Sequence, residues 1–186
     1  IKWGGSSEIQ MGIGQSITTL TPAAVSRYAA RLGNGGIVYN LSIVDSITSP
    51  DGDILNQYQP SVFGHLEDAY LYLPYIKEGM KGVVDAEGTA GRLFRGWKYR
   101  EEVWGKTGTS QVTIGNIKLD LENNGWFVLL TPFSTDAEIA VITLIPNGLS
   151  GSLTAPAAKQ FVEWWMSNRS LTTQESPPVG GNELMP

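Results

Sequence analysis

The sequence predicts a single α+β domain, a mixed α/β sandwich in which an antiparallel sheet is flanked by helices. Its 186 residues suit one hydrophobic core rather than two. Three segments with the composition of strands follow one another in the second half of the chain with no long helix between them. Segments with apolar residues at helical spacing precede and follow these strands, so helices are expected to cover the sheet.

The first 50 residues predict a loop, a helix and a strand. Residues 1–20 are rich in Gly and Ser, which indicates a loop. Thr21-Pro22 supplies a cap and a proline at the first helical position, and Gly33-Asn34-Gly35-Gly36 ends the helix. Ile37–Ile47 is rich in β-branched residues and is expected to form a strand, which the turn signal Asp51-Gly52 follows.

The next segments are less uniform. Residues 53–65 favour neither a helix nor a strand. A second helix is expected from about Pro74 to Val84, because Ile76, Met80, Val83 and Val84 share one side of it. Gly88–Gly91 ends this helix.

The second half carries the predicted sheet. Val103–Val112 is expected to be a strand, and 116–124 a polar connection. Trp126–Leu130 and Ile139–Ile145 are strongly apolar, and six residues separate them, which indicates a hairpin with a loop.

A last helix is expected from about Ala155 to Asn168, with Ala158, Phe161, Val162 and Trp165 on one face. Trp164-Trp165 is interpreted as core packing rather than as a platform for a ligand. Residues 171–186, with Pro177-Pro178 and Gly180-Gly181, are expected to be a flexible tail, so the domain spans residues 1–170.

Composition excludes several classes of function. The net charge is −5 and no basic run occurs, which argues against a nucleic-acid partner. Cysteine is absent and His65 is the only histidine, so thiol catalysis and the usual zinc sites are excluded, and no metal or cofactor is expected. His65 is expected to be structural or exposed. Asp85 and Glu87 could resemble an acid/base pair, but a solvated helix end is the better interpretation.

The most informative stretch is Trp104-Gly105-Lys106-Thr107-Gly108-Thr109-Ser110-Gln111. Its Gly-Lys-Thr suggests the end of a phosphate-binding loop, but that motif requires Gly where Arg100 stands and opens a helix, whereas Val112 begins a strand-like segment. Two interpretations remain. One is an exposed turn before a strand, and the other is the Lys-Thr-Gly motif of serine acyl-transferases that act on penicillin and on peptidoglycan stem peptides.

The second interpretation has a physical basis. On an edge strand, the Lys106 ammonium can hold a substrate carboxylate. Thr107 and Thr109 occupy alternate positions, so their hydroxyls point the same way and can donate to that carboxylate. Gly108 lets a substrate approach the backbone. The backbone N–H of Thr109 can supply half of an oxyanion hole.

The surrounding motifs resemble class B penicillin-binding proteins. Gly12-Ile13-Gly14-Gln15-Ser16, Thr21-Pro22 and Asn34-Gly35-Gly36 resemble the Gly-x-Gly-Gln…Thr-Pro…Asn-Gly-Gly run of that family. Gly88-Thr89-Ala90 and the Trp126-Phe127…Pro132 stretch resemble its later motifs. The matches keep the family's order and cover about residues 8–165.

This resemblance implies the C-terminal portion of a D,D-transpeptidase domain with a β-lactamase/transpeptidase-like fold. Such enzymes cross-link peptidoglycan stem peptides through a serine acyl-enzyme and bind β-lactams covalently. They lie on the extracytoplasmic face of the bacterial membrane, anchored by an N-terminal helix, where cell-wall synthesis proteins are their expected partners. By the same resemblance, Gln111 is expected to line the cleft.

Two of the family's three motifs are missing. None of the lysines from Lys77 to Lys159 has Ser three positions earlier, and no Asn has Ser two positions earlier, so Ser-x-x-Lys and Ser-x-Asn do not occur. We therefore expect no catalytic nucleophile in this chain and place it upstream of residue 1, in the rest of the same domain. Two alternatives stay open: a β-lactamase or β-lactam sensor domain, and a non-catalytic scaffold homologue.

Overall fold

The structure is a computed structural model that describes residues 9, 11, 12, 14, 15, 19–114 and 117–172. Most of the predicted N-terminal loop, together with residues 173–186 of the predicted tail, lies outside these ranges. The elements in chain order are α2 (Pro22–Gly33), β1 (Ile37–Tyr39), β2 (Ser46–Thr48), β3 (Ile54–Gln57), β4 (Val62–His65), α3 (Ala69–Val84), α4 (Gly91–Phe94), the 3-10 turn η1 (Arg100–Glu102), β5 (Trp104–Ser110), β6 (Thr113–Ile114), β7 (Ile117–Lys118), β8 (Asn124–Thr131), β9 (Ile139–Ile145) and α5 (Gly151–Thr172).

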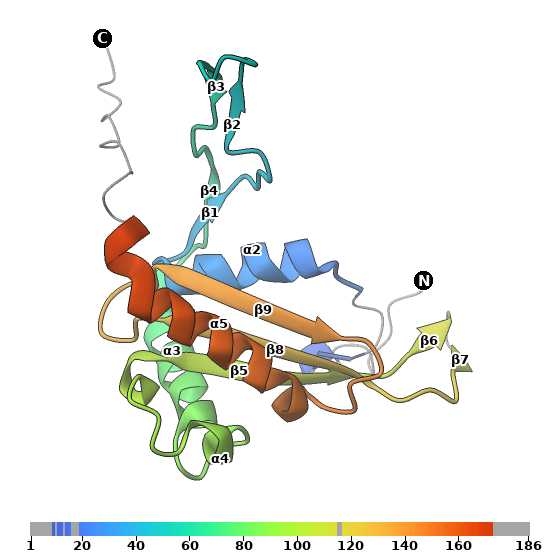
Figure 1. The fold of residues 1–186 in the computed structure, drawn as a ribbon. Coiled ribbons are helices and arrows are strands. Elements are labelled where there is room, and N and C mark those ends of the chain that lie inside the picture. The colour runs from blue at the N-terminus through green and yellow to red at the C-terminus, as the bar shows by residue number, and fades with distance from the viewer. Residues whose placement is uncertain (1–8, 10, 13, 16–18, 115–116, 173–186) are drawn as a thin grey trace.

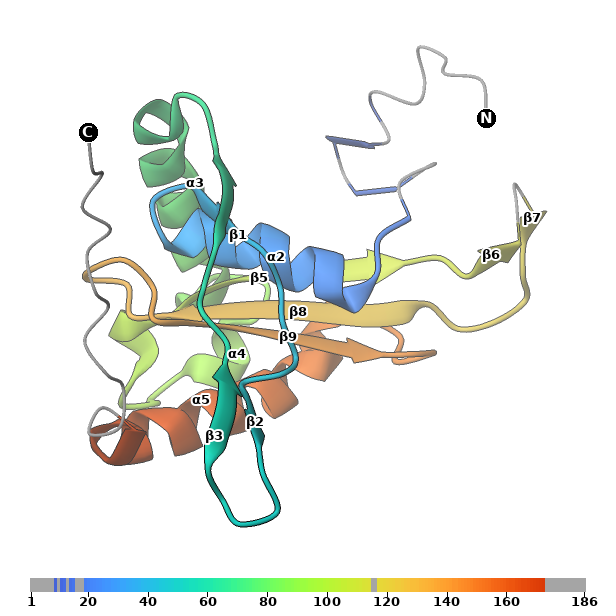
Figure 2. The ribbon, with the colours of Figure 1, turned by 90° about the horizontal axis from the view of Figure 1, so that it is seen from above.

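The predicted antiparallel sheet flanked by helices is confirmed. Its strands follow the order β5-β8-β9, with β8 in the centre (Figure 1). The register places Thr107 opposite Phe127, and Phe127 opposite Thr143. Helix α5 packs on one face, while α2 covers β9 and α3 covers β5 on the other, as the view from above shows (Figure 2).

Alternating residues of β8 build the two halves of the core. Phe127 and Leu129 are fully buried against α5, where they contact a cluster that includes Val84, Phe94, Ala155, Ala158 and Val162. Leu130 points to the other face and packs with Met80 of α3 and Trp104 of β5. Because successive side chains of a strand point to opposite faces, one apolar strand anchors both helix layers.

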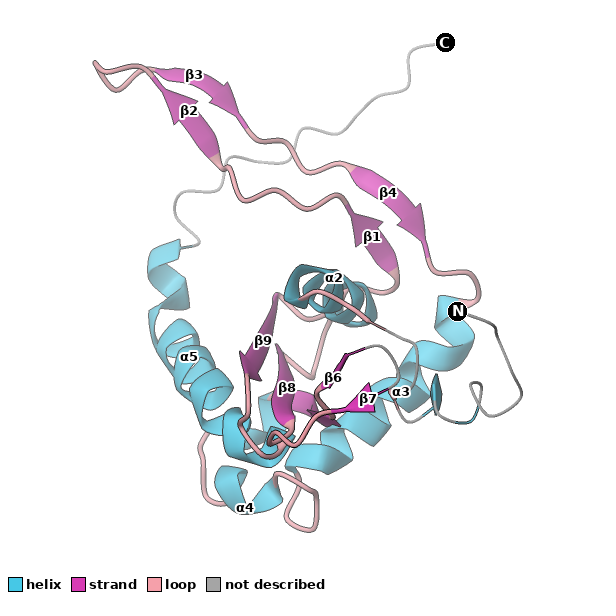
Figure 3. Cartoon of the chain, turned by 90° about the vertical axis from the view of Figure 1, so that its right-hand side faces the viewer, coloured by secondary structure: helices cyan, strands magenta, loops and turns pink. Residues whose placement is uncertain are grey.

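The predicted strand Ile37–Ile47 is wrong in one respect, because it is two separate strands. β1 and β2 pair with β4 and β3, which come from the ambiguous residues 53–65, and the ribbon extends away from the body as an arm of residues 37–65 (Figures 1 and 3). The hydroxyl of Tyr58 donates to the carbonyl of Asn40 at 2.9 Å between the two ladders. His65 lies exposed at the end of β4, as one of its two interpretations predicted.

Two helices begin earlier than predicted. α3 starts at Ala69 and α5 at Gly151, so Pro74 and Pro156 lie inside them. A proline removes one helical hydrogen bond, but the rest of each helix still buries its apolar stripe. At the other end, α5 continues to Thr172, two residues into the predicted tail. A short hairpin pairs β6, which precedes the predicted polar connection, with β7 inside it, and Thr113 lies opposite Lys118.

The expected apolar face of α5 is only partly correct. Ala158 and Val162 are buried, but Phe161 is 46% exposed and Trp164 is 57% exposed. Ala155, Ala158 and Val162 form the stripe that meets the sheet, and the two aromatic residues flank it on the solvent side. The interpretation of Trp164 as core packing is therefore wrong, whereas Trp165 is half-buried.

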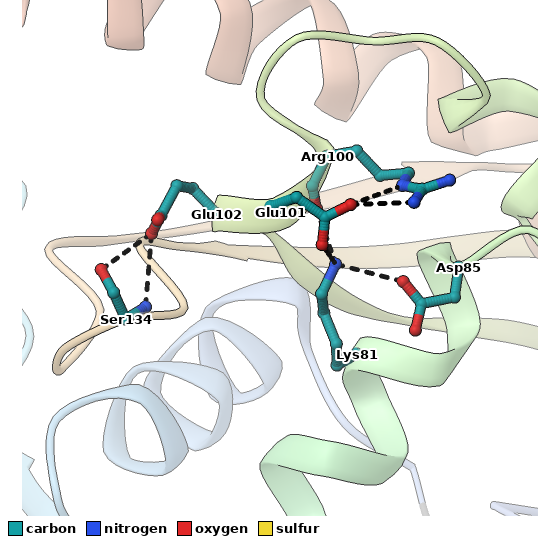
Figure 4. Close-up of polar contacts among 6 residues, drawn as sticks. All are labelled: Lys81, Asp85, Arg100, Glu101, Glu102 and Ser134. Atoms are coloured by element: carbon teal, nitrogen blue, oxygen red, sulfur yellow. Dashed lines mark hydrogen bonds and ion pairs between the residues drawn. The ribbon is translucent and has the colours of Figure 1, made fainter.

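A charged cluster joins the end of α3 to the turn before β5 (Figure 4). The ammonium of Lys81, which is 8% exposed, lies 3.1 Å from Asp85 and 3.3 Å from Glu101, and it donates to the Arg100 carbonyl at 2.8 Å. Asp85 lies at the end of α3 with its side chain 46% exposed, as expected, and it also pairs with Lys81, while Glu87 is exposed as expected. Hydrogen bonds from Arg100 and Lys81 lower the pKa of Glu101.

A second contact holds the same turn to the loop between β8 and β9 (Figure 4). The Glu102 carboxylate accepts hydrogen bonds from the Ser134 hydroxyl at 2.9 Å and from its backbone N–H at 3.3 Å, and the hydroxyl bond lowers the pKa of Glu102. Together, the two contacts fix the start of β5 from both sides.

Two Gly→Ala variants should change stability in opposite directions. A Cβ on Gly125 would lie 2.6 Å from the Ser150 carbonyl oxygen and 2.5 Å from the Thr154 methyl, so Gly125→Ala should destabilise the fold by about 1–3 kcal/mol. Gly79 lies in α3 with open space around it, so Gly79→Ala should stabilise by about 0.5–1 kcal/mol. Urea unfolding measures both free energies, and a neutral Gly125→Ala would contradict the packing of α5 on β8.

Acid should weaken the Lys81 cluster. The folded-state pKa of Glu101 lies below its ordinary value of 4.5. The stability that the ionised Glu101 carboxylate contributes to the fold is therefore fully present above pH 4.5 and is lost as the pH falls through the lowered pKa. Lys81→Met removes one of the two cations that lower this pKa. The variant should therefore lose less thermal stability than the wild type between pH 6 and pH 3, and equal losses would contradict the expectation.

Candidate functional site

Strand β5 lies at an edge of the sheet, as predicted, and presents one row of backbone groups away from β8. The carbonyl of Thr107 accepts from the Lys106 ammonium at 2.7 Å, and the carbonyl of Thr109 accepts from the Gln15 amide at 3.0 Å. In an antiparallel strand, the N–H and C=O of one residue point to the same side. The N–H of Thr109 therefore also points to the edge.

The side chains of the Lys-Thr-Gly segment alternate between the two faces. A Cβ on Gly105 would contact Phe127 and Leu129 at 3.3 Å, so odd-numbered residues of β5 point to the α5 face. Thr107 and Thr109 share that face, which confirms that their side chains point the same way. Lys106 starts from the opposite face, is exposed, and reaches the edge by folding onto the Thr107 carbonyl.

The N-terminus of α5 lies directly against this strand. A Cβ on Gly151 would lie 2.5 Å from the Gly108 nitrogen, so only glycine permits the approach. The N–H of Gly151 donates to the Thr109 hydroxyl at 3.3 Å, which leaves the Thr109 proton available to a ligand. A helix N-terminus carries partial positive charge. The ammonium of Lys106 and the start of α5 therefore both favour an anion at this edge.

Thr107 has a hydroxyl neighbour that the sequence interpretation did not assign. The Thr89 hydroxyl lies 3.3 Å from the Thr107 hydroxyl. Thr89 belongs to the Gly-Thr-Ala run, which the sequence comparison noted only as a family motif. Gln15 also belongs to a family motif, and its amide donates to the Thr109 carbonyl, so Gln15 lies beside β5. Neither contact has a local sequence signal, because the partners lie 18 and 94 residues apart.

Gln111 makes none of the contacts just described, and the cavity between the helices lies elsewhere. Gln111 is exposed beyond the end of β5. A cavity of about 490 Å³ lies between α2, α3 and the β8–β9 loop, and none of residues 106–111 lines it. Within the part of the chain that the structure describes, no group of three or more His, Asp or Glu residues could hold a metal ion. No helix in that same part combines the length and apolar character needed to cross a membrane.

Relatives of known function match nearly the whole chain. The Haemophilus influenzae protein named peptidoglycan D,D-transpeptidase MrdA is 28% identical over 187 residues, which cover 90% of this chain and 27% of that protein. Its Escherichia coli K12 namesake is 28% identical over 195 residues, which cover 97% of this chain and 30% of that protein. The chain thus spans less than a third of the length of these relatives.

Solved structures share the fold. Pseudomonas aeruginosa PBP2 in complex with WCK 5153 matches with a TM-score of 0.68 and 29% identity, over 88% of this chain and 33% of that one. Penicillin-binding protein A from Mycobacterium tuberculosis, as an imipenem acyl-enzyme complex, matches with a TM-score of 0.68 and 23% identity, over 83% of this chain and 32% of that one.

The family model described as the penicillin-binding protein transpeptidase domain matches residues 1–163. This match covers the edge strand β5, the turn that carries Thr89 and the start of α5. The chain therefore belongs to the penicillin-binding protein transpeptidase domain family.

Proposed function

We propose that this chain is the C-terminal part of a serine D,D-transpeptidase that cross-links peptidoglycan stem peptides and binds β-lactams covalently. The observation that carries the proposal is strand β5, which presents the Lys106 ammonium and the Thr109 N–H at the edge of the sheet and two threonine hydroxyls on the face where α5 begins. This set of donors suits a carboxylate and a developing oxyanion. The family membership and the similarity to the relatives named peptidoglycan D,D-transpeptidase MrdA support the reaction class.

Each residue of the strand has a distinct role in this proposal. The Lys106 ammonium moves from the Thr107 carbonyl to the substrate carboxylate, to which Thr107 and Thr109 donate their hydroxyl protons. Gly108 lets the substrate lie against the backbone, and the Thr109 N–H donates to the oxyanion of the tetrahedral intermediate. Gln111 lines the outer end of the cleft. The geometry supports these roles because the Thr107 and Thr109 hydroxyls share one face of β5, while the Lys106 ammonium lies at its edge.

The nucleophile belongs, in this proposal, to a preceding part of the same polypeptide. The support is twofold: Ser-x-x-Lys and Ser-x-Asn do not occur in the sequence, and the chain spans only 27–30% of the MrdA relatives. The complete protein would act on the extracytoplasmic face of the membrane, anchored by an N-terminal helix and together with other cell-wall synthesis proteins. The open edge of β5 would then face the segment that carries the serine.

Lys106→Ala should slow labelling of the full-length protein by a fluorescent penicillin by about 10- to 100-fold, because a charge-assisted hydrogen bond to the carboxylate is lost. Lys118→Ala, at an exposed position in β7, is the matched control and should label like the wild type. The rate of gain of fluorescence on the protein band measures both. Equal labelling of Lys106→Ala and the wild type would remove Lys106 from the site.

A transpeptidase and a β-lactamase differ in the fate of the acyl-enzyme. With a chromogenic cephalosporin, we expect a burst in which each protein molecule opens one cephalosporin and changes its colour. Slow release of the acyl group from the protein should follow. Stopped-flow absorbance measures the burst and the steady rate. Rapid, sustained turnover would instead favour the β-lactamase alternative, and no burst from the full-length protein would favour the scaffold alternative.

A further inference from the structure

We propose that Thr89 is a positioning residue for carboxylate recognition: its hydroxyl donates to the Thr107 hydroxyl and thereby directs the Thr107 proton toward the ligand. The proposal rests on the proposed function and adds to it a residue outside the Lys-Thr-Gly strand. Its starting point is the distance of 3.3 Å between the two hydroxyl oxygens, in which either could be the donor.

The ligand decides the direction of this hydrogen bond. A hydroxyl has one proton to donate and can accept on its lone pairs, whereas an ionised carboxylate only accepts. Thr107 can therefore bind the carboxylate through its hydroxyl only by donating to it. The bond between the two threonines must then run from Thr89 to Thr107. A hydroxyl that accepts one bond while donating another is polarised, which strengthens the bond it donates.

The neighbouring threonine of β5 has the same arrangement. Thr109 accepts from the N–H of Gly151, so its proton is also left for the ligand. Each of the two threonines thus has a neighbour from another element, the start of α5 for Thr109 and the turn after α3 for Thr107. On the Thr109 side the donor is fixed, because a backbone N–H cannot accept. On the Thr107 side the donor has to be the Thr89 hydroxyl.

The turn that carries Thr89 has little freedom to move. A Cβ on Gly88 would lie 2.1 Å from the Gly82 carbonyl oxygen, and one on Gly91 would lie 1.9 Å from the Asp85 carbonyl oxygen. The backbone of this turn therefore lies in direct contact with the last turn of α3. The N–H of Ala90 also donates to the Val83 carbonyl at 3.0 Å. Thr89 is held beside β5 by backbone packing, so its hydroxyl is in place before a ligand arrives.

The test uses three variants of the full-length protein and two probes, benzylpenicillin and its methyl ester. Thr89→Val removes the hydroxyl at nearly constant volume. It should lower the second-order acylation rate constant for benzylpenicillin about three- to tenfold, which corresponds to the net contribution of one hydrogen bond. The ester lacks the charged carboxylate, so its rate constant should change by less than about twofold, within the scatter of a near-neutral substitution. Thr89→Ser should restore the rate with benzylpenicillin. Thr48→Val, on the exposed strand β2 of the arm, is the matched control and should acylate like the wild type.

A double variant separates positioning from a general structural role. If Thr89 acts through Thr107, then Thr89→Val combined with Thr107→Val should acylate no more slowly than Thr107→Val alone. Additive losses, equal slowing of the acid and the ester, or an unchanged rate for Thr89→Val would each overturn the inference. A wild-type protein that benzylpenicillin does not acylate would instead overturn the proposed function, so the two failures are distinguishable.

Discussion

Burial of strand β8 on both faces is the constraint on which the rest of the structure depends. Phe127 and Leu129 require a helix layer on one side, and Leu130 requires another on the opposite side. Both layers form, with α5 on one face and α2 and α3 on the other. Because β8 occupies the centre of a three-stranded sheet, β5 lies at the edge, where half of its backbone groups are left for a ligand.

Close backbone packing then brings two further elements to that edge. Gly151 starts α5 against Gly108, and the Gly88–Gly91 turn lies on the end of α3. A side chain at Gly88, Gly91 or Gly151 would separate the elements and move their donors away from Thr107 and Thr109. The site is thus assembled by the helix layers that the core requires. The charged cluster around Lys81 adds to this by joining α3 to the turn that enters β5 (Figure 4).

The sequence predicted the strand of the candidate site well and its neighbours poorly. Edge position and the common direction of Thr107 and Thr109 follow from a local motif and from strand periodicity. The same periodicity starts Lys106 from the opposite face, although the sequence analysis expected it to hold one carboxylate together with the two threonines. Thr89 and Gly151 could not be found in this way, since their contacts depend on how helices cross the sheet. The Gly-Thr-Ala motif was visible, but nothing local assigned it to Thr107.

The sequence by itself determined the elements whose signals are local. Thr21 caps α2, where its hydroxyl accepts from the Ala24 N–H at 3.2 Å, and the apolar runs of β8 and β9 form the predicted pair. Tertiary structure alone decided the division of residues 37–65 into two ladders and the early starts of α3 and α5. It also decided which donors meet β5. The physical reason is distance along the chain: propensities and caps act within a few residues, whereas Thr89–Thr107 and Gly151–Thr109 join groups 18 and 42 residues apart, which only the packed core brings together.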